Sequence, residues 1–205
     1  MTDLLKHEFR FLAKPLNWTS RAILLVGVVA IMASYWFPLW EIHLLAPQYR
    51  EGLNLDIHSW RIVAGNNGND LVEINELNHY IGMRPLQEAD FFEMKWIPFI
   101  LGGFALLTLR AAVFGMMRNI IDLFFMFSYF GAFSIGSFVY RLYTFGHTMD
   151  PHAAIHIKPF TPVIFGTQRI ANFTQSSLPQ FGTYLLAAYV LSILLAGWFS
   201  RKEAV

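Results

Sequence analysis

Cysteine is absent from this 205-residue chain, and charged residues make up only 14% of it. Without thiols the chain has no disulfide, no Cys-based zinc site, no iron-sulfur cluster and no thiolate nucleophile. Lys and Arg total 15 against 14 Asp and Glu, so the chain lacks the positive field that nucleic-acid binding requires. We therefore expect no nucleic-acid partner. Any metal site must use His, Met, carboxylate or backbone ligands.

Apolar and aromatic residues are in excess. Hydrophobic residues reach 55%, aromatic residues 17%, and the mean hydropathy is +0.42. A soluble domain of this length has few places to bury so many rings without exposing adhesive patches. A lipid bilayer removes that difficulty, so the composition predicts a membrane protein.

Four stretches are long and apolar enough to cross a bilayer: residues 22–40, 96–114, 124–140 and 183–199. The first has 19 residues without a charge, which as a helix would span a hydrocarbon core of about 30 Å. It exceeds the apolar region of about 7–15 residues in a cleaved signal peptide, so we interpret it as an uncleaved anchor. The sequence predicts an all-α membrane protein with four transmembrane helices and a small extracytoplasmic cap.

The basic residues indicate how this bundle is oriented. Two long loops hold ten of the 14 acidic residues, whereas eight of the 15 basic residues lie in short segments on the side of the N-terminus. By the positive-inside rule both termini are expected in the cytoplasm. The other segments are predicted as a cytoplasmic interfacial helix, a cytoplasmic loop, a cytoplasmic tail and two outer loops: residues 1–21, 115–123, 200–205, 41–95 and 141–182.

The predicted spans themselves carry little chemistry. None contains a histidine for haem or a deep carboxylate for proton or ion coupling, and no phosphate-loop or hydrolase motif occurs in the chain. Stripes of small residues in the second and third spans are expected to let helices approach closely: Gly102, Gly103 and Ala105, and Ser128, Ala132 and Gly136. Chemical function is therefore expected in the outer loops.

The first outer loop predicts the cap. Residues 39–45 and 53–58 have strand patterns separated by a turn and predict a hairpin, and residues 65–69 predict a second turn. Asp70 and Glu73 have the spacing of a capping box at the start of a short helix, which Gly82 is expected to end. The cap is thus predicted as a hairpin plus a short helix.

Six of the seven histidines lie in the two outer loops. His79 and Met83 have i, i+4 spacing on the predicted helix, and imidazole with thioether suits Cu(I) better than zinc, calcium or magnesium. The second loop offers further candidate metal ligands: His147, Met149, His152 and His156. A zinc-type histidine pair, or a solvated loop without metal, remains an alternative for that cluster.

Several strings resemble a known family. They are Pro38-Leu39-Trp40, Ala46-Pro47-Gln48-Tyr49, Glu51-Gly52-Leu53, Leu77-Asn78-His79-Tyr80-Ile81-Gly82-Met83 and Asp150-Pro151, with Ala154, Ile155 and Lys158. Together they resemble a poorly characterised family of small bacterial membrane proteins that often accompany the copper-handling accessory proteins of nitrous-oxide reductase clusters. The resemblance implies a bacterial inner-membrane location, copper as the metal, and His79 and Met83 as ligands. His152 and His156 fall outside the pattern of the family.

Three hypotheses for function follow. The leading one is a membrane-anchored accessory protein that holds Cu(I) on the outer side and delivers it to a copper enzyme or copper chaperone. The second is a non-catalytic structural or assembly subunit of a larger membrane-bound respiratory or copper-enzyme complex, with other membrane subunits as partners. The third, a copper oxygenase or oxidoreductase, needs further ligands and an open substrate position that the sequence does not place.

Overall fold

The computed structural model describes residues 10–155, 158–170 and 172–202 and has a mixed α/β fold, with 59% helix and 19% strand. The all-α prediction is therefore wrong. The described residues fall into two compact units. The described part of the helical unit comprises residues 10–34, Pro98–Ala132 and residues 184–202, and that of the sheet unit comprises Tyr35–Ile97 and the described residues within 133–183. The expected interfacial helix at residues 1–21 lies partly outside the described residues.

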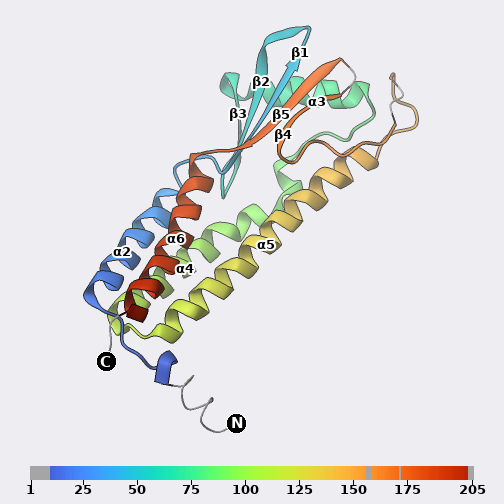
Figure 1. Cartoon of the computed structure of the whole chain (residues 1–205). Helices are drawn as coiled ribbons and strands as arrows, with labels where there is room; N and C mark the ends of the chain where they lie inside the picture. Colours follow the sequence, from blue (N-terminus) through green and yellow to red (C-terminus); the bar gives the residue numbers. More distant parts are fainter. Residues whose placement is uncertain (1–9, 156–157, 171, 203–205) are drawn as a thin grey trace, which may run out of the picture. The chain divides into compact units, whose positions relative to one another are not determined.

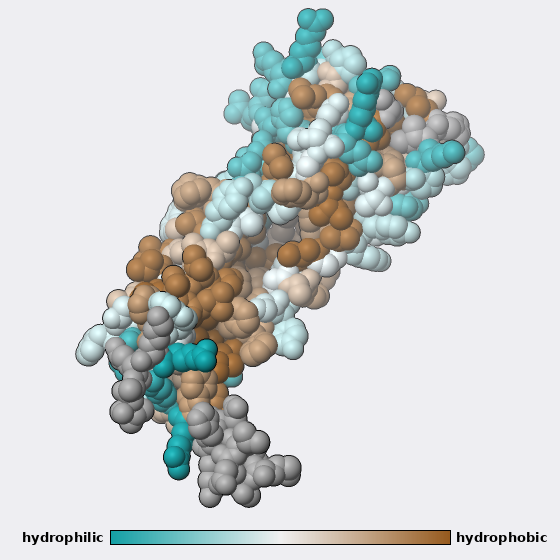
Figure 2. Space-filling model, in the orientation of Figure 1, coloured by the Kyte–Doolittle hydropathy of each residue, from teal (hydrophilic) through white to brown (hydrophobic). Residues whose placement is uncertain are grey.

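The helical unit is built from α2 (Trp18–Ala33), α4 (Ile97–Phe114), the first part of α5 (Met117–His147) and most of α6 (Phe181–Lys202). Its centre is fully buried and mostly apolar, and includes Leu24, Ile31, Leu101, Tyr189 and Ile193. The buried Tyr189 hydroxyl lies 2.7 Å from Thr108 Oγ1, so these two buried hydroxyl groups are hydrogen-bonded to each other. Figure 2 shows apolar side chains gathered over these helices and hydrophilic ones over the sheet unit.

Three helices in the described part of the chain are long and apolar enough to cross a membrane: Ile97–Phe114, Met117–His147 and Phe181–Arg201. The first predicted span is the exception. Its helix has only 16 residues and ends at Ala33, because the chain then turns before Pro38 and enters a strand at Trp40. Sixteen residues extend about 24 Å, short of a hydrocarbon core of about 30 Å. The prediction of four transmembrane helices is thus corrected.

The predicted boundaries of the other spans differ in one respect. Helix α4 and helix α6 lie close to the predicted segments, but α5 has 31 residues and extends into both neighbouring predicted loops, from Met117 in residues 115–123 to His147 in residues 141–182. Arg118, Asn119 and Asp122 suggested a loop because they are polar. Polarity alone does not end a helix when no glycine or proline interrupts it, so these residues form the first turns of α5.

A tight contact between α2 and α6 lies at Gly27, outside the predicted stripes. A Cβ on Gly27 would lie 2.1 Å from Ser192 Oγ, so α2 and α6 approach too closely there for any side chain. A Cβ on Gly103 or Gly136 would meet nothing within 4 Å. Gly103 and Gly136 of the predicted stripes therefore do not mark tight helix contacts, whereas Ala105 of the second span is buried in the core.

The sheet unit contains five antiparallel strands in the order β3-β2-β1-β5-β4. The bounds are β1 Trp40–Ala46, β2 Tyr49–Ile57, β3 Ile62–Ala64, β4 Gly166–Ile170 and β5 Phe173–Pro179. The predicted hairpin is confirmed as β1 and β2. Strands β4 and β5 come from the second outer loop, where no strand was predicted, and β5 pairs with β1 in the middle of the sheet.

Helix α3 (Asn69–Tyr80) packs on one face of this sheet, and a small apolar core lies between them (Figure 1). Leu53 and Leu55 from β2, Ile62 from β3 and Ile74 from α3 are its buried members. The Tyr49 hydroxyl donates a hydrogen bond to Glu73 of α3, and this bond together with burial raises the pKa of Tyr49 to about 12. The other sheet face carries a polar row across four strands: Asn54, His43, Ser176 and Thr167.

The start of α3 differs from the predicted capping box. Gly68, with φ +94°, precedes the helix and no side chain caps it. Asp70 is instead buried, and its Oδ2 accepts a hydrogen bond from the backbone N–H of Asn54 at 2.8 Å. The carboxylate therefore ties α3 to strand β2. The predicted end is confirmed, since Gly82 follows the helix with φ +79°.

The Gly27 contact gives a stability prediction. Gly27→Ala should lower the free energy of unfolding in detergent by about 1–3 kcal/mol, because the new methyl group overpacks the α2 and α6 contact. Gly103→Ala is the matched control and should be neutral or stabilising by up to about 1 kcal/mol, since it adds helix propensity in open space. Equal losses in both variants, measured by thermal unfolding, would contradict this packing.

Candidate functional site

The two segments that carry the predicted metal ligands meet in the sheet unit. Met83, just after α3, and Met149, just after α5, form an isolated antiparallel β-bridge. The Asp150 N–H donates to the Gly82 carbonyl at 2.7 Å, and the Ile155 N–H donates to the Tyr80 carbonyl at 2.9 Å. The backbones of the two outer loops therefore meet at this point, which the sequence alone left open.

Gly82 permits this close approach. Its φ of +79° is a conformation that residues with a Cβ rarely adopt. A Cβ at this position would also lie 2.8 Å from both the Ala153 Cβ and the Asp150 carbonyl oxygen. The glycine that ends α3 is thus also the residue against which the second segment packs.

The bridge places two methionines opposite each other in the backbone. Residues directly opposite in an antiparallel pair project to the same side, with Cβ atoms about 4.5–5.5 Å apart. Met83 and Met149 are both partly buried. Met83 also lines a cavity of about 80 Å³ between the sheet, α3 and the end of α5, mostly apolar, in which the Nδ2 atom of buried Asn78 has no hydrogen-bond partner.

The histidines lie mostly outside this bridge. His79 and His152 are exposed, and His156 lies outside the described residues. His147 ends α5, and its ring stacks on Tyr143 at 3.9 Å while its Nδ1 lies 2.9 Å from the Tyr143 carbonyl oxygen. A carbonyl can only accept, so Nδ1 carries the proton and the lone pair of Nε2 is available to a metal.

Within the described part of the chain, no three His, Asp or Glu side chains gather so that they could hold a metal ion. A zinc-type site built on the predicted histidines is therefore absent from these residues. The i, i+4 pair of His79 and Met83 is split, because His79 is exposed on the helix while Met83 faces the cavity. A metal site here must rely on the two methionines, with an imidazole as an additional ligand.

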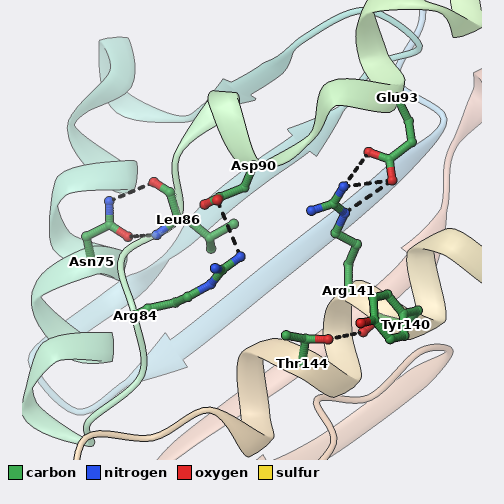
Figure 3. Close-up of polar contacts among 8 residues, drawn as sticks. All are labelled: Asn75, Arg84, Leu86, Asp90, Glu93, Tyr140, Arg141 and Thr144. Carbon is green, nitrogen blue, oxygen red and sulfur yellow. Dashed lines mark hydrogen bonds and ion pairs between the residues drawn. The ribbon is translucent and has the colours of Figure 1, made fainter.

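The loop that carries Met83 is held in place by side chains that the sequence did not single out (Figure 3). The Asn75 amide makes two hydrogen bonds to the backbone of Leu86, one donated and one accepted, at 3.1 and 2.7 Å. Arg84 pairs with Asp90 at 3.4 Å, and its guanidinium lies 4.5 Å from the ring centre of Phe145 on α5. These contacts attach the loop to both α3 and α5.

An ion pair with little exposure completes this attachment. Arg141 of α5 donates to both carboxylate oxygens of Glu93 at 2.8 and 2.9 Å, and the Ser137 hydroxyl donates to the same carboxylate at 2.6 Å. Burial raises the pKa of Glu93, but the hydrogen bonds from Ser137 and Arg141 outweigh it and leave the pKa below its usual value. The signal for this pair in the sequence was an arginine in an otherwise apolar helix, which requires a partner.

The ion pair predicts a pH dependence. A carboxylate whose pKa is lowered by folding stabilises the protein above its unfolded value of 4.5, and this contribution is lost as pH falls through the lower folded value. Glu93→Gln should reduce the free energy of unfolding at pH 7 by about 1.5–3 kcal/mol and flatten the acid limb of stability against pH. Glu88→Gln, an exposed residue of the same loop, is the control. An unchanged acid limb in Glu93→Gln would refute the assignment.

Comparisons with known proteins do not add to this description. Neither the protein-family models, nor the curated proteins, nor the solved structures include a match to this chain. The resemblance to the copper-associated family therefore stays a prediction.

Proposed function

We propose that this protein is a membrane-anchored accessory protein that holds Cu(I) through Met83 and Met149 and passes it to a protein partner. The observation that carries the proposal is the antiparallel bridge between these residues, which joins two segments far apart in the sequence. His147 is the best candidate for a third ligand, because its Nδ1 is occupied by a carbonyl and its Nε2 is not. His79 and His152 are exposed near the same segments and are suited to capture and release.

The chemistry of the donor set favours Cu(I) over harder ions. Thioether and neutral imidazole are soft ligands without charge, whereas magnesium and calcium require several oxygen ligands. The surroundings of Met83 are apolar, so a divalent ion there would lack the carboxylates that compensate its charge. A monovalent soft ion carries the smaller desolvation cost.

Membrane topology supports a location for the site outside the cytoplasm. Helices α4 and α5 are joined through Gly115 and Met116, so the end of α4 and the start of α5 lie on one membrane side, and the other two helix ends on the opposite side. The first side carries Arg110 and Arg118, which the positive-inside rule assigns to the cytoplasm. The sheet unit, which joins the opposite ends, then faces the periplasm in a bacterial inner membrane.

The proposal is tested by anaerobic titration of purified protein with Cu(I) against a competing chelator. Met83→Leu and Met149→Leu should each weaken Cu(I) affinity by about 100-fold or more, since even loss of a residue that only orients a ligand costs about 10–100-fold. Leucine conserves volume, so stability should fall by less than about 1.5 kcal/mol. His147→Ala should weaken binding less.

Met94→Leu is the matched control, because Met94 packs against the apolar core of the same unit away from the bridge. Cu(I) affinity should be unchanged in this variant. Equal affinity in the wild type, Met83→Leu and Met149→Leu would refute the copper site. If the wild type, Met83→Leu and Met149→Leu also assembled equally well with a copurified membrane complex, the alternative of a structural or assembly subunit would be favoured.

A further inference from the structure

Four exposed aromatic side chains and one exposed arginine form a group in the sheet unit. We call Trp36, Phe37, Trp60, Arg61 and Phe181 the interfacial patch. Exposure reaches 73% for Trp36, 46% for Trp60 and 53% for Phe181, which is high for such large apolar groups. Trp60 and Arg61 come from the turn between β2 and β3, whereas Trp36 and Phe37 precede β1.

Contacts link the members of the interfacial patch. Trp60 Nε1 donates to the Tyr35 carbonyl at 3.3 Å, which ties the β2 to β3 turn to the segment before β1. The Phe37 and Phe181 rings meet edge to face, with centroids 4.8 Å apart. The Arg61 guanidinium lies 4.2 Å from the centre of the Trp60 ring. The patch is therefore one connected surface rather than scattered exposed residues.

The position of Phe181 indicates what covers this surface. Phe181 is the first residue of a helix long and apolar enough to cross a membrane, so it marks where that helix leaves the hydrocarbon core. Tryptophan is enriched at this level because its ring has an apolar body and a polar N–H. An arginine beside it complements the phosphate of an anionic headgroup. Trp60 contacts the Tyr35 carbonyl, and Arg61 contacts the Trp60 ring. These contacts place both residues at the depth of Phe181, although they lie in a turn of the sheet.

We propose that the turn between β2 and β3 inserts into the membrane interface, with Trp60 among the headgroups and Arg61 bound to the phosphate of an anionic phospholipid. The sheet unit then has a contact with the bilayer that is independent of the transmembrane helices. Trp60 thus lies beside Tyr35, although the two residues are 25 positions apart in the sequence.

The absence of cysteine makes the depth of this turn directly measurable. Trp60→Cys carrying a nitroxide label, in nanodiscs of phosphatidylcholine and phosphatidylglycerol, should collide with apolar oxygen far more than with a water-soluble nickel chelate. The same label at Thr167→Cys, an exposed position on β4, should show the reverse. The proposal would be overturned if the label at residue 60 had the same oxygen and nickel accessibility as the label at residue 167. It would also be overturned if a protein partner shielded the label at residue 60 from both reagents.

A second measurement keeps the native side chain. Lipids brominated near the headgroup should quench wild-type fluorescence more than that of Trp60→Phe, and the difference reports Trp60 alone. Native mass spectrometry should show that Arg61→Gln weakens retention of a bound phosphatidylglycerol by about fivefold, the equivalent of one basic residue at an anionic surface. Arg50→Gln, an exposed arginine at the far end of β2, is the control and should leave retention unchanged. Equal retention in both variants, or no quenching difference, would refute the lipid contact.

Discussion

The pairing of β1 with β5 is the interaction on which the rest of the sheet unit depends. It joins segments that are far apart in the chain, as the hydrogen bond from Trp40 Nε1 to Ser177 Oγ shows, across 137 residues and at 2.8 Å. Both strands are internal, so their backbone donors and acceptors are satisfied on two sides. Because β5 precedes α6 and β1 follows α2, this pairing also brings together the segment that follows α2 and the segment that leads into α6.

The two units satisfy their backbone polar groups in different ways. In the helical unit most backbone N–H and C=O groups are paired within their own helix, which is the arrangement that a lipid environment requires. The sheet unit instead buries one face under α3 and presents the polar row of His43, Asn54 and Ser176 on the other. A half-covered antiparallel sheet of this kind is suited to an aqueous environment.

The candidate site follows from how the loop after α3 is held. That loop is attached to α3 through Asn75 and to α5 through Arg84 and the Glu93 and Arg141 ion pair, so Met83 is presented by a positioned backbone. The carboxylate also compensates an arginine that an apolar helix would otherwise leave without a partner. One set of contacts therefore serves both the stability of the sheet unit and the approach of Met83 to Met149.

The sequence by itself determined the features that local patterns encode. Long apolar stretches predicted α4 and α6, and alternation of apolar and polar residues predicted the hairpin. The glycine at residue 82 predicted the end of α3. Tertiary structure decided the features that depend on distant partners. Residues 34–40 are apolar enough for a membrane span, but pairing with β5 makes Trp40 the start of a strand. The same holds for the site, since spacing grouped His79 with Met83 on one helix, whereas the fold exposes the histidine and places Met83 opposite Met149. Sequence spacing shows which side chains can meet on one helix. It does not show which distant segments pack together, because contacts across long loops depend on the fold of the whole chain.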